Sequence, residues 1–167
     1  MAPPDPSDIP CPAPSSDGSR PPASGDGRPT LVVVGNGMVG HKLLTLLAER
    51  GAPARWNIVT FAEEYRLAYD RVGLSSYFTG STAEDLALAS PGEYEAAGIT
   101  VHLGDRVEAI DRAARTVRSA AGRTIAWDKL VLATGSYPFV PPIEGGDTPG
   151  TFVYRTIDDL EAIAAWA

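Results

Sequence analysis

Cysteine is nearly absent from the sequence, because Cys11 is the single one among 167 residues. One thiol cannot form an intramolecular disulfide, a Cys-x-x-Cys redox pair, or a cysteine-ligated zinc or iron–sulfur site within the chain. Cys11 also lies in a proline-rich stretch that offers it no supporting structure, so we interpret it as incidental rather than catalytic. Chemistry that needs paired thiols on this chain is therefore excluded.

Long apolar runs and an excess of positive charge are also missing. No stretch approaches the roughly 18 apolar residues that cross a bilayer, and the first residues lack the apolar region of a secretory signal. We therefore expect a cytoplasmic protein without a membrane partner. The formal net charge of −7 leaves no basic face to neutralise nucleic-acid phosphates. These absences favour a small molecule as the partner.

Proline is concentrated at one end of the chain. Residues 1–29 contain nine of the 15 prolines, with Ser, Asp and Gly between them. So polar a segment cannot bury enough apolar surface to offset the entropy of ordering, and we expect a disordered tail. The remainder is predicted to form one domain over residues 30–155, followed by the start of a linking helix over residues 156–167.

The chain becomes apolar at Thr30 and then alternates between strand and helix patterns. The run LVVV is typical of a strand buried on both faces of a parallel sheet. Leucines at helical spacing follow, with Gly51 as a stop signal, and a second strand is predicted over Trp56–Phe61. We therefore predict an α/β fold built on a parallel sheet.

The second half of the chain predicts a different kind of crossover. The segments VEAID, RTVRSA and RTIAW alternate between apolar and polar residues, which is typical of an antiparallel meander. Around them the patterns predict a short helix at the capping box Ser81 to Glu84, a helix over Pro91–Ala97 that ends at Gly98, a strand over Ile99–Leu103, a buried strand over Lys129–Thr134 and a helix over Thr156–Ala167.

The motif Gly35-x-Gly37-x-x-Gly40 joins the first strand to the first helix. Gly35 permits the tight turn, Gly37 lets a pyrophosphate approach the backbone, and Gly40 lets the helix pack close to the sheet. The helix N-terminus, where Met38 lies, offers free N–H groups and a positive dipole end to phosphates. The strand before the motif and the amphipathic helix after it favour dinucleotide binding over a merely tight turn.

A carboxylate is expected at the end of the second strand to bind ribose hydroxyls in such a fold. Glu63 lies there and is our candidate ribose ligand, with Glu64 as the alternative. The remaining interpretation is a carboxylate that is only solvated and binds no ribose.

A meander in place of a crossover helix, followed by a strand that runs into Ala133, Thr134 and Gly135, resembles the FAD-binding half of the pyridine nucleotide-disulfide oxidoreductase family. The resemblance extends from Leu31 to about the last residue. It implies a Rossmann-like FAD-binding domain, in which the Ala-Thr-Gly segment passes under the cofactor and the backbone of Val107 contacts adenine.

The loop YDRVGLSSYF, residues 69–78, runs from the ribose-binding edge toward the flavin in this resemblance. Arg71 and Ser75 are then expected near the flavin, with Leu74-Ser75 beginning a short helix. Many relatives carry a lysine where this chain has Ser76, and a hydroxyl cannot favour an anionic reduced flavin as that cation does. The two loop tyrosines could stack near the flavin or pack on the core, and both alternatives stay open for Tyr69 and Tyr77.

Several motifs together resemble the large subunits of NAD(P)H-dependent nitrite reductases: VVVGNGMVG, AYDRVGLSSYF, AEDL, ATGSYPFVPPI and VYRTIDDLEAI. This similarity implies hydride transfer from NAD(P)H to FAD, then electron transfer through an iron–sulfur cluster to siroheme, where nitrite becomes ammonium. It also implies a nitrite reductase small subunit as a partner. The alternatives are a ferredoxin- or rubredoxin-type reductase, the electron-transfer subunit of assimilatory nitrate reductase, and a non-catalytic nucleotide-binding remnant.

The chain lacks other features that this resemblance implies. It has no second G-x-G-x-x-G, no later Gly-Asp segment that closes over FAD, and no cysteines for siroheme and iron–sulfur centres. We therefore expect an incomplete flavin domain, truncated before an absent NAD(P)H-binding domain and inactive by itself. NAD(P)H, siroheme and the iron–sulfur cluster are expected to bind only in the missing part.

The remaining polar candidates have structural interpretations. His41 and His102 share no ligand spacing, so we expect a polar surface residue and a strand residue that faces solvent or a polar contact. Asp158, Asp159 and Glu161 fit the first turns of a helix better than a metal site. The sequence predicts no catalytic residue and no metal ligand in this chain.

Overall fold

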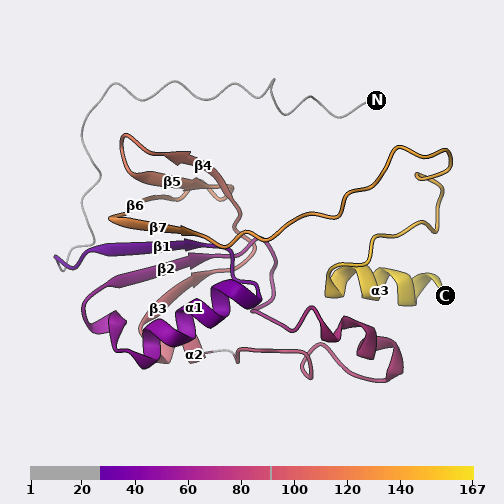
Figure 1. Ribbon diagram of the computed structural model, residues 1–167, viewed down its shortest axis with the longest axis horizontal. Coiled ribbons are helices and arrows are strands. Elements are labelled where there is room, and N and C mark those ends of the chain that lie inside the picture. The colour runs from indigo at the N-terminus through magenta and orange to yellow at the C-terminus, as the bar shows by residue number, and fades with distance from the viewer. Residues whose placement is uncertain (1–26, 91) are drawn as a thin grey trace.

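The computed structural model describes residues 27–90 and 92–167. It contains a parallel sheet, a small antiparallel sheet, and a C-terminal helix reached by a long connection (Figure 1). The predicted disordered tail, with Cys11, lies outside the described residues apart from its last three. Of these, Arg28 and Pro29 accept hydrogen bonds from Asn57 at 3.1 and 2.9 Å. The folded unit therefore includes two residues assigned to the tail.

Four parallel strands form the main sheet in the order β3-β2-β1-β7, which confirms the predicted α/β class. Every residue of β1 is buried, as its apolar run predicts for a central strand. β7 ends two residues earlier than predicted, because its partner β1 also ends there and turns at Gly35. The bounds are β1 Thr30–Val34, α1 Met38–Glu49, β2 Asn57–Phe61, β3 Ile99–His102 and β7 Lys129–Leu132.

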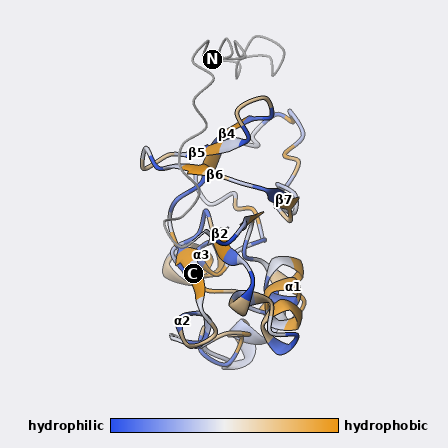
Figure 2. Cartoon of the chain, turned by 90° about the vertical axis from the view of Figure 1, so that its left-hand side faces the viewer, coloured by the Kyte–Doolittle hydropathy of each residue, from blue (hydrophilic) through white to orange (hydrophobic). Residues whose placement is uncertain are grey.

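Alternate side chains of β1 pack into two separate cores. Leu31 and Val33 lie in one cluster with Leu44 of α1, which is fully buried. Val32 points the other way and packs with Val117 of the antiparallel sheet. Figure 2 shows α1 and that antiparallel sheet on opposite sides of the parallel strands. The period of two along a strand thus creates three layers from one central strand.

The crossover from β3 to β7 is an antiparallel meander rather than a helix, as predicted. Its strands are β4 Val107–Asp111, β5 Thr116–Ser119 and β6 Thr124–Ala126, paired in the order β4-β5-β6. The register of β4 against β5 shifts between Val107 and Ala109, and such a shift re-aims the residues beside it. The beginning of β4 therefore leaves the regular ladder.

The long loop between β2 and β3 contains two short helices. η3 spans Gly73–Thr79 and begins one residue before the predicted start. α2 spans Glu93–Ala96, which is shorter than predicted, and Gly98 after it adopts a φ of 74°.

A third short helix, η2 at Ala52–Ala54, lies between α1 and β2. It follows Gly51, whose φ of 66° ends α1 as predicted.

The predicted helix at Ser81 is wrong, because the chain forms only a turn there. Thr82 and Asp85, rather than Ser81 and Glu84, exchange the reciprocal bonds of a capping box, at 2.8 and 3.2 Å. Two residues beyond Asp85, Ala87 forms an antiparallel bridge to the loop before η3. The backbone must be extended at that bridge, so the turn has no room to continue as a helix.

α3 spans Ile157–Trp166 and begins at the predicted threonine cap. The Thr156 hydroxyl accepts a hydrogen bond from the Asp159 N–H at 3.1 Å, and the Asp159 carboxylate accepts one from the Thr156 N–H at 2.8 Å. Leu160 is fully buried and packs in a cluster with Leu74 of η3. α3 is thus fixed onto the loop between β2 and β3 (Figure 1).

Asp105, which is buried, ties the meander to the end of β3. Its carboxylate accepts a hydrogen bond from the Ala121 N–H at 2.9 Å and pairs with Arg123 at 3.2 Å. Burial by itself would raise the pKa of Asp105, but hydrogen bonds from Ala121 and Ser119 and the charge of Arg123 outweigh it. The pKa of this carboxyl therefore lies below its usual range.

We predict that Asp105→Asn destabilises the fold at pH 7 and that this effect fades in acid. A carboxyl whose pKa is lower in the folded state contributes stability above its unfolded pKa of about 4, and loses it as the pH falls through the folded pKa. Urea unfolding of both proteins between pH 7 and pH 3 measures this. A difference that stays constant over that range would contradict the assignment.

Candidate dinucleotide-binding site

The glycine turn after β1 is held against the segment that follows β7. Gly35 has a φ of 106°, and its N–H donates to the carbonyl of Phe61 at 2.9 Å. A Cβ at Gly35 would lie 2.3 Å from the carbonyl oxygen of Ala133, and a Cβ at Gly40 would lie 2.1 Å from that of Gly35. Both positions therefore require glycine, for conformation and for close packing respectively.

Gly37 differs from the other two glycines of the motif because it faces open space. A Cβ there would meet nothing within 4 Å, and the residue is the N-cap of α1 without any side-chain cap. His41 donates its N–H to the Gly37 carbonyl at 2.8 Å, and N–H groups in the first turn of a helix have no acceptor within the helix. These groups and the helix dipole form a site for an anion such as a pyrophosphate.

The conformation of the turn is fixed from α2 through the buried side chain of Asn36. The Tyr94 hydroxyl donates to Asn36 Oδ1 at 2.9 Å, and His41 Nδ1 lies 2.7 Å from the same hydroxyl. Because that hydroxyl has one proton, His41 Nδ1 is the donor to it. Burial raises the pKa of Tyr94 to about 12, so the phenol stays protonated. His41, which we expected to be a polar surface residue, is thus half-buried and hydrogen-bonded to Tyr94.

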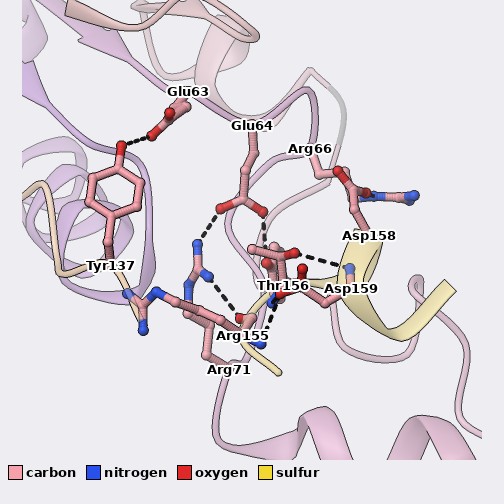
Figure 3. A network of polar contacts seen from close by, with 10 residues as sticks. Glu63, Glu64, Arg66, Arg71, Tyr137, Arg155, Thr156, Asp158 and Asp159 are labelled. Carbon is pink, nitrogen blue, oxygen red and sulfur yellow. Dashed lines mark hydrogen bonds and ion pairs between the residues drawn. The ribbon is translucent and has the colours of Figure 1, made fainter. Parts of the chain in front are cut away.

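The two candidate ribose ligands after β2 have different surroundings (Figure 3). Glu64 accepts a hydrogen bond from Tyr69 at 2.7 Å and forms an ion pair with Arg71. Glu63 accepts a hydrogen bond from Tyr137, lies 3.8 Å from Arg106, and keeps 49% of its side chain exposed. Glu64 is therefore used inside the protein, whereas Glu63 remains open to a ligand.

The loop residues that sequence reasoning placed near the flavin make internal contacts. Arg71 donates to the carbonyl of Arg155 at 3.0 Å in addition to its ion pair with Glu64. Ser75 is exposed, and the Ser76 hydroxyl donates to the carbonyl of Gly73 at 2.8 Å within η3. Arg71 therefore fastens the loop to the segment just before α3.

Both loop tyrosines pack on the core, as one of the two alternatives from the sequence predicted. Tyr69 is buried, and Tyr77 packs against the cluster that contains Leu74. Burial and then the hydrogen bond to Glu64 raise the pKa of Tyr69, so its hydroxyl remains a donor.

The remaining predicted contacts lie at the ends of β1, β4 and β7. Ala133 donates its N–H to the Val34 carbonyl at 2.8 Å, and Thr134 and Gly135 follow it in exposed positions. Val107 is the half-buried first residue of β4, beside the register shift. The parallel strands bring the segment after β7 and the glycine turn to one end of the sheet, as expected for a ligand at the carboxyl ends of strands.

Arg155 was missed by sequence reasoning. A Cβ at Gly135 would lie 3.4 Å from Arg155 Nη2, so this guanidinium lies beside the exposed segment after β7. It forms no ion pair within the described part of the chain. It lies twenty residues after Gly135 in the sequence, and only the fold brings the two together.

The acidic residues at the start of α3 have structural roles, as predicted. Asp159 caps the helix, while Asp158 and Glu161 pair with Arg66 at 3.4 and 2.7 Å. The His102 ring lies against that of Phe61, with ring centroids 4.9 Å apart and the ring planes tilted by 38°. Burial and the charge of nearby Arg123 lower the pKa of His102.

A cavity of about 710 Å³ lies elsewhere, between β3 and the loop before η3. Its lining includes Tyr65, Ala89, Tyr94 and Val101 but none of the glycines of the turn and neither Glu63 nor Val107. The candidate site is instead an open surface at the carboxyl ends of the strands.

The parallel sheet, the glycine turn and the helix that follows it form a Rossmann-like unit. The chain belongs to the pyridine nucleotide-disulphide oxidoreductase family, whose model matches residues 29–166. Within the described residues, no helix is both long enough and apolar enough to span a bilayer.

Relatives are found among nitrogen-metabolising reductases. The chain is 52% identical over 137 residues to the nitrite reductase (NADH) large subunit of Escherichia coli (strain K12), which covers 82% of this chain and 16% of that protein. It is 37% identical over 134 residues to the assimilatory nitrate reductase electron transfer subunit of Bacillus subtilis (strain 168), covering 80% and 17% respectively. The predicted resemblance to the N-terminal part of nitrite reductase large subunits is thus confirmed.

Solved structures show the same architecture. A ferredoxin reductase from Rhodopseudomonas palustris matches with a TM-score of 0.74 and 25% identity, covering 83% of this chain and 34% of that one. This match supports a Rossmann-like fold shared with reductases. The chain spans only 16 to 17% of the length of the two curated relatives named above.

We predict that the glycines of the turn separate stability from binding. Gly40→Ala should lower the free energy of unfolding by about 1–3 kcal/mol, because its methyl group meets the Gly35 carbonyl. Gly37→Ala should change it by less than about 1 kcal/mol. The methyl group added at Gly37 would occupy the space proposed for the phosphates. The affinity of the Gly37→Ala variant for ADP should therefore fall about tenfold or more.

Urea unfolding and calorimetric titration with ADP measure these effects. If Gly37→Ala keeps the affinity of the unmodified chain, phosphate does not bind at this turn.

Proposed function

We propose that this chain forms the FAD-binding cradle of an NAD(P)H-dependent reductase of the nitrite reductase type. The observation that carries the proposal is the glycine turn. Gly35 and Gly40 are locked by backbone contacts, while Gly37 leaves open space in front of the N-terminus of α1. This shape and the helix dipole fit a pyrophosphate, which every flavin adenine dinucleotide contains.

The adenosine half of the cofactor would extend from the turn toward β2 and β4. Glu63 is the ribose ligand in this proposal, because its carboxylate is half exposed, whereas that of Glu64 is occupied by Tyr69 and Arg71. The backbone of Val107, at the irregular start of β4, would contact adenine. Met38, in the first turn of α1, would contact the phosphates through its N–H.

The flavin half would extend along the segment after β7 and the loop before η3. Ala133, Thr134 and Gly135 would lie under the cofactor, and the guanidinium of Arg155 beside Gly135 would supply positive charge. Arg71 would act near the flavin by holding Arg155 and the loop in place, since its own guanidinium is engaged. Ser75 of η3 is exposed and would complete this side of the site.

FAD, when bound, supplies a ring system that takes a hydride from NAD(P)H and releases electrons one at a time. The chain itself binds and orients the cofactor and supplies no dithiol, because Cys11 is its one cysteine. Electrons would therefore go to an iron–sulfur cluster and siroheme held by residues outside this chain, with nitrite as the final acceptor. The small subunit of a nitrite reductase is the proposed protein partner.

Nitrite reductase is favoured over the nitrate reductase electron-transfer subunit by sequence similarity. The chain is 52% identical to the named nitrite reductase subunit and 37% identical to the nitrate reductase subunit, over similar lengths. A cytoplasmic location would follow from the same assignment.

We predict that the purified chain binds FAD and that Glu63→Gln weakens this binding about ten- to hundredfold. A hydrogen bond to a carboxylate contributes about 1.5–3 kcal/mol, and about 1.4 kcal/mol corresponds to a factor of ten. Flavin fluorescence quenching measures the affinity.

Glu64→Gln is the matched control, and it should affect the free energy of unfolding more than FAD affinity. FMN, which lacks the adenosine half, should bind equally to both variants and to the unmodified chain. If the unmodified chain binds neither FAD nor ADP, the proposal is contradicted.

A further inference from the structure

The carboxylate proposed to bind ribose is itself held by residues from two distant segments. The Tyr137 hydroxyl, from the segment after β7, donates a hydrogen bond to Glu63 Oε2 (Figure 3). The Arg106 guanidinium, just before β4, lies 3.8 Å from Glu63 Oε1. The ends of β2 and β7 and the start of β4 thus meet at one carboxylate.

Packing does not explain the position of Tyr137, because 72% of its surface is exposed. Its ring therefore buries little apolar area, and polar contacts of its hydroxyl hold it in place: the hydrogen bond to Glu63 and an interaction with the Arg106 guanidinium. Pro138 follows it and disfavours helical backbone at Tyr137, so the phenol is presented from an extended segment.

The bond to Tyr137 leaves Glu63 able to bind a ligand. An ionised carboxylate has about four lone-pair sites, and Tyr137 uses one of them. The contact with Arg106 is long and half exposed, so it contributes little to the energy. The hydrogen bond to Glu63 and, to a smaller extent, burial raise the pKa of Tyr137, so the phenol remains a donor at neutral pH.

We propose that Tyr137 is a positioning residue for the adenosine ribose: its hydroxyl orients the Glu63 carboxylate so that the free oxygen sites face the ribose diol. This inference rests on the proposed function and adds to it the residue that sets the geometry of the ribose contact. The ligand class is an adenine nucleotide with both ribose hydroxyls free.

The test compares ADP with 2′,3′-dideoxyadenosine diphosphate, which lacks both hydroxyls. Tyr137→Phe should weaken ADP binding about three- to tenfold, the effect of losing one orienting hydrogen bond. It should leave the affinity for the dideoxy analogue unchanged. Tyr65→Phe, which alters another highly exposed tyrosine outside this network, is the matched control and should change neither affinity.

Two further measurements separate positioning from a general structural effect. The urea midpoint of Tyr137→Phe should equal that of the unmodified chain. In combination with Glu63→Gln, Tyr137→Phe should cause no additional loss of ADP affinity, because the two residues act through one contact.

The outcomes distinguish this inference from the proposal on which it rests. If the unmodified chain binds no ADP, both are overturned. If it binds ADP and Tyr137→Phe binds it equally well or more tightly, Tyr137 does not position Glu63, and the FAD proposal stands without this inference. Equal losses for ADP and for the dideoxy analogue would also overturn it.

Discussion

The close contact between the glycine turn and the segment after β7 is the constraint on which the site depends. The backbone at Gly35 lies so near Ala133 that no side chain fits between them, and Gly40 brings α1 equally close to the turn. Pairing of β7 with β1 makes this contact possible, and the meander that precedes β7 covers the sheet face opposite α1. The crossover from β3 to β7 thus completes the parallel sheet and also supplies the segment that lies against the glycine turn.

Neighbouring carboxylates at the end of β2 have opposite roles in this arrangement. Glu64 joins Tyr69 and Arg71 in a half-buried network that reaches the backbone of Arg155 and so anchors the segment before α3. Glu63, one residue earlier, faces outward. Glu64 therefore has a structural role, whereas the carboxylate of Glu63 remains available to a ligand. By ordering the loop between β2 and β3, the contacts of Glu64 also help to fix the surroundings of Glu63.

Local patterns in the sequence were sufficient for the parallel sheet, the glycine turn and the meander. LVVV and the glycine spacing carry their information within a few residues, and the Thr156 cap does so for α3. The helix expected at Ser81 was wrong because a tertiary bridge at Ala87 overrides a local capping signal. The sequence placed Glu63 before Glu64 as the candidate by position alone, because the contacts that distinguish them depend on partners that only folding brings near.

The same limit explains what was missed around the site. Arg155 lies beside Gly135, and Tyr137 reaches Glu63, through contacts between segments far apart in the chain. No spacing rule links such residues. Tyr94 was likewise not singled out, although it fixes Asn36 and bonds His41. Motifs located the turn, but the contacts that shape and complete it come from other elements.

The central claim is that a pyrophosphate binds at the N-terminus of α1. Amide chemical shifts of a ¹⁵N-labelled chain, followed during titration with ADP, test it most directly. The account predicts the largest shifts at Gly37, Met38 and Val39, whose N–H groups lie at the open end of the helix. Shifts confined to the cavity between β3 and the loop before η3, with none in the turn, would contradict it.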